Sequence, residues 1–180
     1  PATVLGASEM SPFAIAGRYQ GLLNQGYVIP LKAVRSVVSW KNGQLNRKPF
    51  QTESILAPPH AVMVDHMMRR GAQIGTGKVF GKSFNEVMAS KTGTTDNGRD
   101  AWFIGADGRR MGLAWVGFDD NRKGNLVGAL AALPVIQGGF RYIDRMDRTD
   151  RLPSGLKYGW VDHFGQVVGK TCEGAIRRPL

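Results

Sequence analysis

The chain has 180 residues, of which 42% are hydrophobic and 21% charged, proportions that exclude a disordered segment or a coiled coil and allow one buried core. It carries 24 Lys and Arg against 14 Asp and Glu, a formal charge of +10, which favours an anionic partner. The basic residues are scattered and lack the interleaved aromatic residues of a nucleic-acid groove, so we expect no nucleic-acid binding.

The start of the sequence has no feature of a targeting segment. It has neither an initiating Met nor a basic region followed by an apolar stretch and a cleavage site. No apolar run approaches the ~18 residues needed to cross a bilayer. We therefore expect a segment of a longer protein, with any signal or membrane anchor outside this chain. Cys172 is the only cysteine, which excludes an internal disulfide.

The first predicted elements are a helix and a hairpin. Ser11 and Pro12 are typical of a helix N-cap and a first helical residue. Apolar residues follow at helical spacing, and Gly26 is expected to end the helix. Further along, the Asn-Gly pair within residues 41–44 lies between two extended segments and predicts a hairpin.

The middle of the chain predicts a second helix and a second hairpin. The helix covers residues 60–70, ends at Gly71 and turns its Met-rich face to the core. Residues 100–105 and 110–120 read as two strands joined by a primed turn over residues 106–109. Large and small residues alternate in the later strand, which indicates a sheet that is covered on both faces.

A third helix is predicted within residues 125–143, with an apolar stripe that runs up to Pro134, which kinks or ends it. The remainder, from about Asp144, reads as an irregular tail wrapped on the domain. We therefore divide the chain into a domain portion, residues 1–143, and a C-terminal tail, residues 144–180. Together the elements predict an α+β fold, an antiparallel β-sheet flanked by helices.

The polar run "KTGTT" at residues 91–95 has the clearest chemistry. A structural explanation exists, because Thr-rich segments favour strands and Asp-Asn-Gly favours a turn. On a strand, however, Lys91 places an ammonium where an anionic group would bind, and Thr92 and Thr94 offer hydroxyls on one face. Gly93 lets a substrate backbone approach closely. The backbone N–H of Thr94 is placed to stabilise an oxyanion. These residues together suit a carboxylate beside a reacting carbonyl.

The same residues resemble the third active-site motif of class A penicillin-binding proteins. "KTGTT", "DAWFIG" and "WVGFDD" match the motif and the next two strands, although Ser90 stands where that family has glycine. Upstream, "LGASEMSPFAIAGRYQGLLNQGY", "IPLKAVRSVVSWKNGQL" and "GTGK" match in order and approximate spacing, and the final "GQVVGKTCEGAIRRPL" resembles the 1b-like branch. The resemblance covers nearly the whole chain. It implies the penicillin-binding transpeptidase and serine β-lactamase-like fold.

In function, the resemblance implies the C-terminal portion of an active-serine DD-transpeptidase that cross-links peptidoglycan stem peptides and is acylated by β-lactams. It places the protein at the outer, periplasmic face of the cytoplasmic membrane, anchored by a segment outside this chain. Lys91, Thr92, Gly93 and Thr94 match the strand that binds the terminal carboxylate of D-Ala-D-Ala. Thr76 lies in a loop that the family places beside the active site. Implied partners are the missing N-terminal part, including a glycosyltransferase domain, and regulators of cell-wall synthesis, with no cofactor.

The nucleophile of such an enzyme is expected outside this chain. The family takes it from Ser-x-x-Lys, which residues 154–157, "SGLK", match in spacing. They contain a glycine, follow a proline and lie after the Lys-Thr-Gly strand, so we interpret the match as chance. Residues 83–85, "SFN", fit the second motif, Ser-x-Asn, but end only six residues before Lys91. This chain alone is therefore expected to be inactive.

Other clusters give weaker signals. The three histidines and Cys172 form no metal-ligand spacing, so no metal is expected. Asp119 and Asp120 are expected to cap the next element, and residues 75–78, "GTGK", lack the spacing of a phosphate loop. Two alternatives remain open: a non-catalytic relative or fragment that binds an anionic peptide or partner, and, less favoured, a basic nucleic-acid-binding module.

Overall fold

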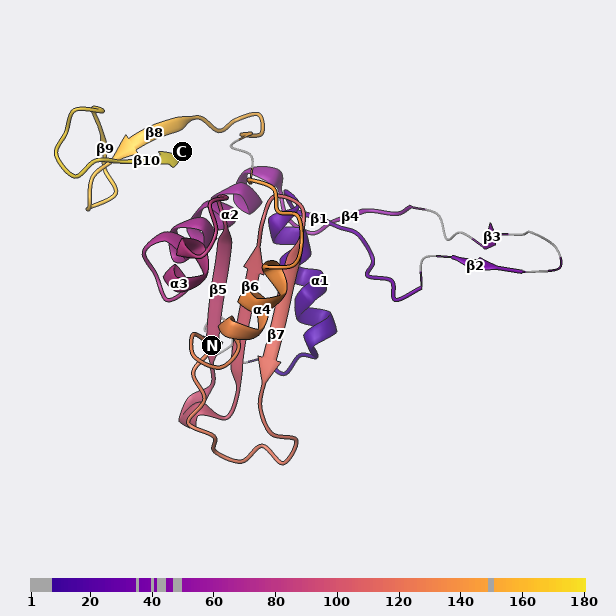
Figure 1. Cartoon of the computed structure of the whole chain (residues 1–180). Coiled ribbons are helices and arrows are strands. Elements are labelled where there is room, and N and C mark those ends of the chain that lie inside the picture. Colours follow the sequence, from indigo (N-terminus) through magenta and orange to yellow (C-terminus); the bar gives the residue numbers. More distant parts are fainter. Residues whose placement is uncertain (1–7, 35, 40, 42–44, 47–49, 149–150) are drawn as a thin grey trace.

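The computed structural model describes residues 8–34, 36–39, 41, 45–46, 50–148 and 151–180. Within them, the centre is an antiparallel sheet in the order β5-β6-β7 (Figure 1). Its strands are β5 (Ala89–Thr94), β6 (Ala101–Ala106) and β7 (Met111–Val116). The helices around it are α1 (Pro12–Leu23), α2 (Pro58–Gln73), α3 (Lys78–Lys82) and α4 (Leu133–Phe140). This arrangement confirms the predicted α+β fold.

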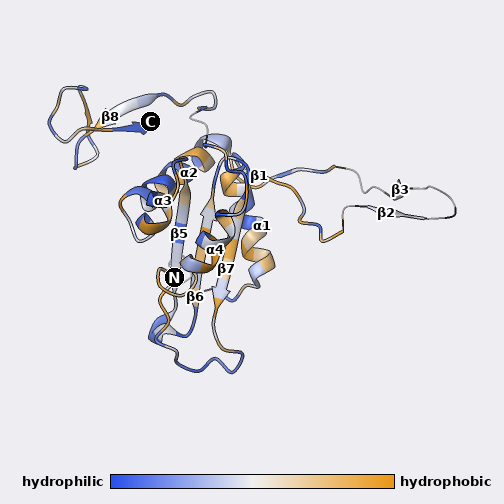
Figure 2. Cartoon of the chain, viewed as in Figure 1, coloured by the Kyte–Doolittle hydropathy of each residue, from blue (hydrophilic) through white to orange (hydrophobic). Residues whose placement is uncertain are grey.

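Helices cover both faces of the central sheet. On one face, Phe103 of β6 packs on Phe80 of α3 with ring centroids 5.2 Å apart, and Phe80 packs on Phe140 of α4 at 5.4 Å. On the other face, Ile104 packs with Met68 of α2 and with side chains of α1. Consecutive strand residues point to opposite faces, so each face of β6 has a buried cluster of its own. Figure 2 shows hydrophobic residues along β6 and a hydrophilic loop after β7.

The first helix starts as its sequence predicts, whereas the second starts at Pro58, two residues before its expected start, and runs past its expected end. Ser11 caps α1, and its hydroxyl accepts a hydrogen bond from Ala14 N at 3.2 Å. The helix α2 continues through Gly71 to Gln73, so the predicted stop at Gly71 is wrong. Gly71 stays helical, and its missing side chain lets α2 approach β5: a Cβ there would lie 3.1 Å from Ser90 O.

Two further predictions from turn residues are wrong. The β6–β7 hairpin forms as predicted, but Gly108 does not have the positive φ that a primed turn needs. Instead, the Asp107 carboxylate accepts from the N–H groups of Arg109 at 2.7 Å and Arg110 at 2.6 Å, which closes the turn through a side chain. Pro134 lies in the first turn of α4, where proline is tolerated, so it begins a helix rather than ending one.

Short strand pairs extend away from the central sheet. The strand β1 (Tyr27–Val28) pairs with β4 (Glu53–Ser54), and β2 (Val37–Val38) pairs with β3 (Leu45–Asn46). Figure 1 shows these pairs on an arm that leaves the domain beside α1. The β2–β3 pairing confirms the predicted hairpin, although its turn, residues 42–44, lies outside the described residues.

The C-terminal segment is more regular than the irregular tail that the sequence predicts. It contains β8 (Tyr158–Val161), β9 (Val167–Val168) and β10 (Ile176–Pro179), which form a separate antiparallel sheet in the order β10-β8-β9. Figure 1 shows this sheet at the top of the view, above α2. The segments "YGWV" and "GQVV" are too short to indicate strands from the sequence alone. The division at residues 143 and 144 stays a prediction.

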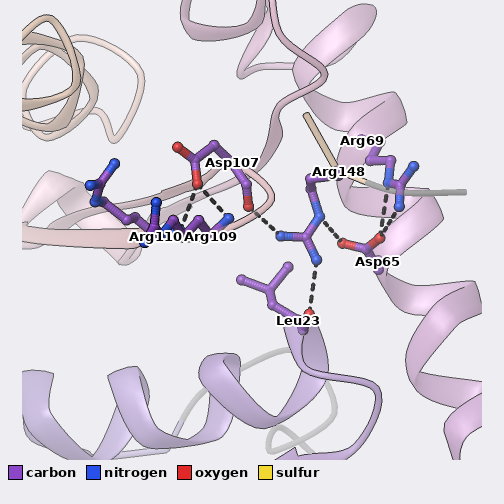
Figure 3. A network of polar contacts seen from close by, with 7 residues as sticks. All are labelled: Leu23, Asp65, Arg69, Asp107, Arg109, Arg110 and Arg148. Atoms are coloured by element: carbon purple, nitrogen blue, oxygen red, sulfur yellow. Dashed lines mark hydrogen bonds and ion pairs between the residues drawn. The ribbon is translucent and has the colours of Figure 1, made fainter. Parts of the chain in front are cut away.

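Arg148 ties the start of this C-terminal segment to the domain (Figure 3). Its guanidinium forms an ion pair with Asp65 of α2 at 2.7 Å and donates to the carbonyl oxygens of Asp107 at 2.6 Å and Leu23 at 2.8 Å. Asp65 also forms an ion pair with Arg69 at 2.8 Å. Burial lowers the pKa of Arg148; the Asp65 charge opposes this lowering, and the Arg69 charge adds to it. One side chain therefore joins α1, α2 and the β6–β7 turn.

Candidate active site

The pairing of β5 with β6 determines which backbone groups of the Lys-Thr-Gly-Thr strand face outward. Thr95 N–H donates to Asp100 O at 3.1 Å, so these residues form a hydrogen-bonded pair. Hydrogen-bonded and non-hydrogen-bonded pairs alternate in an antiparallel ladder, so Thr92 and Thr94 direct their N–H and C=O groups away from β6. Among the described strands, β5 pairs only with β6. The N–H of Thr94 therefore lies on an open edge, where the oxyanion prediction needs it.

The first part of this edge is covered. Ser90 is 2% exposed, and its backbone carbonyl lies against Gly71 of α2. The Ser90 side chain lies against Gly77, where any Cβ would collide with it. The Ser90 hydroxyl has no hydrogen-bond partner within the described part of the chain. The open part of the edge therefore begins after Ser90, at the residues of the motif itself.

Two threonine hydroxyls lie on one face of β5, as the strand period predicts. Thr92 Oγ1 lies 2.6 Å from Thr76 Oγ1, in the turn between α2 and α3, and either hydroxyl can be the donor. Thr94 Oγ1 accepts a hydrogen bond from Gly128 N at 3.1 Å. Both hydroxyls therefore have a polar neighbour that restrains their orientation.

Lys91 brings a positive charge to the same edge. Its side chain is exposed and leaves β5 from the face opposite to Thr92, but its Nζ donates to the Thr92 carbonyl oxygen. That carbonyl points to the open edge, so the ammonium lies there too. Ammonium, hydroxyls and the Thr94 N–H are hydrogen-bond donors, a set that suits an anionic ligand with several acceptor atoms.

A polar contact fixes the far end of β5. Thr95 Oγ1 donates to Asp100 Oδ2 at 2.9 Å and accepts from Asp100 N at 2.9 Å. Trp115 Nε1, from β7, donates to Asp100 Oδ1 at 2.9 Å. The short 3-10 helix Asp96–Gly98 lies between the two strands. Asp100 thus links all three central strands at the end where the motif lies.

The structure brings the predicted site residues together. Lys91, Thr92, Gly93 and Thr94 form most of β5, and Thr76 reaches the strand from the preceding turn. Gly93 also has a packing role, because a Cβ there would lie 3.1 Å from Trp102 Cβ on the neighbouring strand. Their part in substrate binding stays a prediction.

The two motif lookalikes lie in other surroundings. Ser154 is an exposed turn residue followed by Gly155 at φ +90°, so the helix that a Ser-x-x-Lys pair needs does not form there. Ser83 follows α3, where its hydroxyl donates to Val79 O at 2.7 Å and accepts from Gln137 Nε2 at 2.5 Å. That serine joins α3 to α4. The expectation that the nucleophile lies outside this chain stays a prediction.

The other weak candidates have local explanations. Asp120 Oδ1 accepts from Arg122 N at 3.2 Å, within the loop that Asp119 and Asp120 begin. In the described part of the chain, no group of three or more His, Cys, Asp and Glu side chains is placed to hold a metal ion. None of the described helices is long and apolar enough to cross a membrane.

Sequence reasoning missed the residues that hold the motif in place. Gly128 lies 34 residues after Thr94, and no local pattern marks it among the glycines of the chain. Asp100 and Trp115 are 15 residues apart and meet only because the β6–β7 hairpin brings them together. A predicted strand register would have shown the Asp100–Trp115 contact, whereas the Gly128–Thr94 contact depends on the path of a long loop.

Comparison with known proteins extends over the whole chain. The family described as "Penicillin binding protein transpeptidase domain" matches residues 2–127. Penicillin-binding protein 1B of Vibrio cholerae is 34% identical over 190 residues, which cover 100% of this chain and 23% of that protein. Penicillin-binding protein 1B of Escherichia coli is 34% identical over 182 residues, covering 98% of this chain and 21% of that protein. The chain thus spans less than a quarter of these relatives' length.

Solved structures agree on the fold. Penicillin-binding protein 1A from Haemophilus influenzae superposes with a TM-score of 0.83 at 17% identity, covering 99% of this chain and 33% of that chain. PonA1 from Mycobacterium tuberculosis gives a TM-score of 0.63 at 22% identity, covering 84% of this chain and 42% of that chain. These likenesses confirm the predicted fold, and the 1B relatives fit the predicted branch. From the family match, the chain belongs to the penicillin-binding protein transpeptidase domain family, in its class A, 1b-like branch.

Proposed function

We propose that this chain is the C-terminal portion of a serine-type peptidoglycan DD-transpeptidase and supplies its carboxylate-binding strand. The observation that supports this most directly is the open edge of β5. There the Lys91 ammonium, the Thr92 and Thr94 hydroxyls and the Thr94 N–H lie on one short stretch of strand. Hydrogen bonds from such donors to a charged acceptor are stronger than those between neutral groups.

The proposed substrate is a stem peptide that ends in D-Ala-D-Ala. It lies along the open edge as an added strand, so that main-chain hydrogen bonds supply part of the affinity. Its terminal carboxylate binds Lys91 and the two threonine hydroxyls, and Thr76 supports Thr92 through their short contact. Binding the chain end in this way positions the preceding carbonyl for attack.

The proposed reaction is acyl transfer through an acyl-serine. A serine of the parent protein attacks the carbonyl of the penultimate D-Ala; the new C–O bond forms, the C–N bond breaks, and the serine proton passes to the departing D-Ala amine. An amine of a neighbouring stem then attacks the ester, forms the cross-link and returns a proton to the serine. Thr94 N–H donates to the oxyanion in both steps. Loss of one such donor typically costs about 3 kcal/mol of transition-state stabilisation.

The rest of the parent protein completes the proposal. The serine, its lysine base and the Ser-x-Asn group come from the missing N-terminal part, which also carries the membrane anchor and a glycosyltransferase domain. The site then lies at the outer face of the cytoplasmic membrane, where stem peptides are available. β-Lactams enter as acyl donors that occupy the same edge, and regulators of cell-wall synthesis contact the parent protein. No cofactor or nucleic acid takes part.

Labelling with a fluorescent penicillin tests this proposal. We expect covalent label on the parent protein and none on the 180-residue chain alone. The matched control is Ser154→Ala in the parent, which should label like wild type. If the isolated chain takes up the label, and Ser154→Ala abolishes that labelling, the proposal of an upstream nucleophile is refuted. A parent protein that binds D-Ala-D-Ala peptides but takes no label would favour the non-catalytic alternative.

A further inference from the structure

The loop after β7 returns to the sheet at Gly128 and meets β5 at the motif. On the way, the N–H groups of Gly124 and Leu126 donate to Gly98 O, at 3.2 and 2.9 Å. These two bonds attach the loop to the turn between β5 and β6. Gly128 N then donates to Thr94 Oγ1 at 3.1 Å. The loop is therefore held against the β5–β6 turn before Gly128 and against β5 at Gly128 itself.

Gly128 lies directly on the backbone of the central sheet. A Cβ at this position would lie 2.5 Å from Gly93 O and 2.6 Å from Trp102 O. Real Cβ atoms do not approach backbone oxygens so closely, so only glycine fits without a shift of the loop. The position thus needs a missing side chain rather than an unusual backbone angle.

The other side of Gly128 is also fixed. Its carbonyl oxygen accepts from Ala132 N at 3.2 Å and from Leu133 N at 2.9 Å, in the turns that lead into α4. Leu133 is 1% exposed and belongs to the core. The orientation of this residue is therefore set by the core as well as by β5, and its N–H points at Thr94 before any ligand binds.

This contact decides what the Thr94 hydroxyl can do. A hydroxyl has one hydrogen to donate and two lone pairs. Because Thr94 Oγ1 already accepts from Gly128 N, its own hydrogen must point elsewhere, and Thr94 is exposed. At Thr92 the situation differs, because its partner Thr76 is a second hydroxyl and either group can donate. Thr94 is therefore the hydroxyl with the more strongly fixed donor direction.

We propose that Gly128 is a positioning residue that holds the Thr94 hydroxyl as a hydrogen-bond donor to the carboxylate of the substrate or β-lactam. The inference rests on the proposed function of the β5 edge. The fixed Thr94 donor also gives a basis for selectivity. A ligand whose free carboxylate accepts this hydrogen bond is favoured over one whose carboxylate has been blocked. Gly128 itself touches no substrate and acts through Thr94.

The test compares two probes in the parent protein: a penicillin with its free carboxylate, and the methyl ester of the same penicillin. Gly128→Ala should lower the acylation rate constant for the free carboxylate by about ten-fold or more, the loss of one hydrogen bond to a charged group. The ester should change much less. Thr94→Val should do the same, and the double variant should be no slower than either single variant. Gly138→Ala, in α4 with open space around its Cβ, is the matched control and should behave as wild type.

The outcomes separate this inference from the proposed function. If Thr94→Val lowers the carboxylate-to-ester ratio but Gly128→Ala does not, the role of Gly128 is refuted and carboxylate binding stands. If neither Thr94→Val nor Lys91→Ala changes the ratio, the proposed function of the edge fails. Equal losses for both probes in Gly128→Ala would show a merely structural role. Should that variant not fold, replacing Gly128 by glycolate, which exchanges the amide N–H for an ester oxygen and adds no side chain, must lower the ratio.

Discussion

Replacing Arg148 with Met should destabilise the domain more than any loss of a surface charge. Arg148→Met keeps a long apolar side chain but removes the guanidinium. Among the described residues, the buried Asp65 carboxylate then keeps Arg69 as its ionic partner. The carbonyl oxygens of Asp107 and Leu23 lose their donor.

Burial sets the size of this effect. The Arg148 and Asp65 side chains are 10% and 8% exposed. Removing one partner of a buried ion pair costs about 3–5 kcal/mol, because the other charge stays buried. Since Asp65 retains Arg69, we expect a loss near the lower end, about 3 kcal/mol of the free energy of unfolding.

Urea unfolding of the chain measures the difference through the midpoint and slope of the transition. The matched control is Arg122→Met. Arg122 pairs with Asp120 at 3.6 Å, but these side chains are 64% and 61% exposed. An exposed pair contributes at most about 1 kcal/mol. Equal losses for Arg148→Met and Arg122→Met would refute the reasoning from burial.

Four other changes test particular contacts. Ser90→Ala should raise the free energy of unfolding by about 1 kcal/mol, because it removes a buried hydroxyl that has no partner among the described residues; a lower urea midpoint would contradict this. Gly77→Ala should destabilise the wild type but much less a Ser90→Gly variant, since the new methyl group meets the Ser90 side chain; the same loss in both backgrounds would count against that contact. The Arg145 hydrogen bond lowers the pKa of Glu86. The stabilisation that this bond gives to the folded state should therefore be complete above the ordinary Glu pKa of about 4.3 and be lost as the pH falls through the lower folded-state value. If wild type and Glu86→Gln unfold at the same acid pH, this contribution of Glu86 to stability is disproved. Lys91→Ala in the parent protein should slow acylation by β-lactams about ten-fold or more, and stopped-flow rates equal to wild type would exclude a charge role for Lys91.

Sequence predicted the elements whose determinants are local. Ser11 caps α1 through a hydrogen bond within one turn, and the β6–β7 hairpin follows from two apolar strands with a short turn. The predictions at Gly71 and Pro134 were wrong because glycine can end a helix or lie within one, and proline can end a helix or begin one. Gly71 continues a helix that needs close contact with β5, and Pro134 begins a helix after the turn at Gly128. Tertiary contacts determine which of the two roles each residue has, and no local sequence pattern shows those contacts.

The candidate site follows the same division. The motif and its strand were predictable because Lys91, Thr92 and Thr94 are neighbours in sequence. Thr76 was inferred from the family resemblance rather than from its own surroundings. The contacts that orient the motif come from Gly128 and Asp100, which loops and hairpins bring to β5. A sequence pattern thus located the strand of the candidate site without showing what holds its hydroxyls in place.

The open edge of β5 is short, and its length limits what can bind there. Its start is covered where Ser90 meets α2, and it ends after Thr95, where the chain turns into the short 3-10 helix Asp96–Gly98. Only Thr92 and Thr94 direct backbone groups outward between these points, over about 10 Å of strand at ~3.3 Å per residue. A long open edge would invite pairing with other strands, whereas a short one beside the charged Lys91 resists it. Under the proposed function, the same limits favour the end of a peptide, whose carboxylate meets the donors, over the middle of a chain.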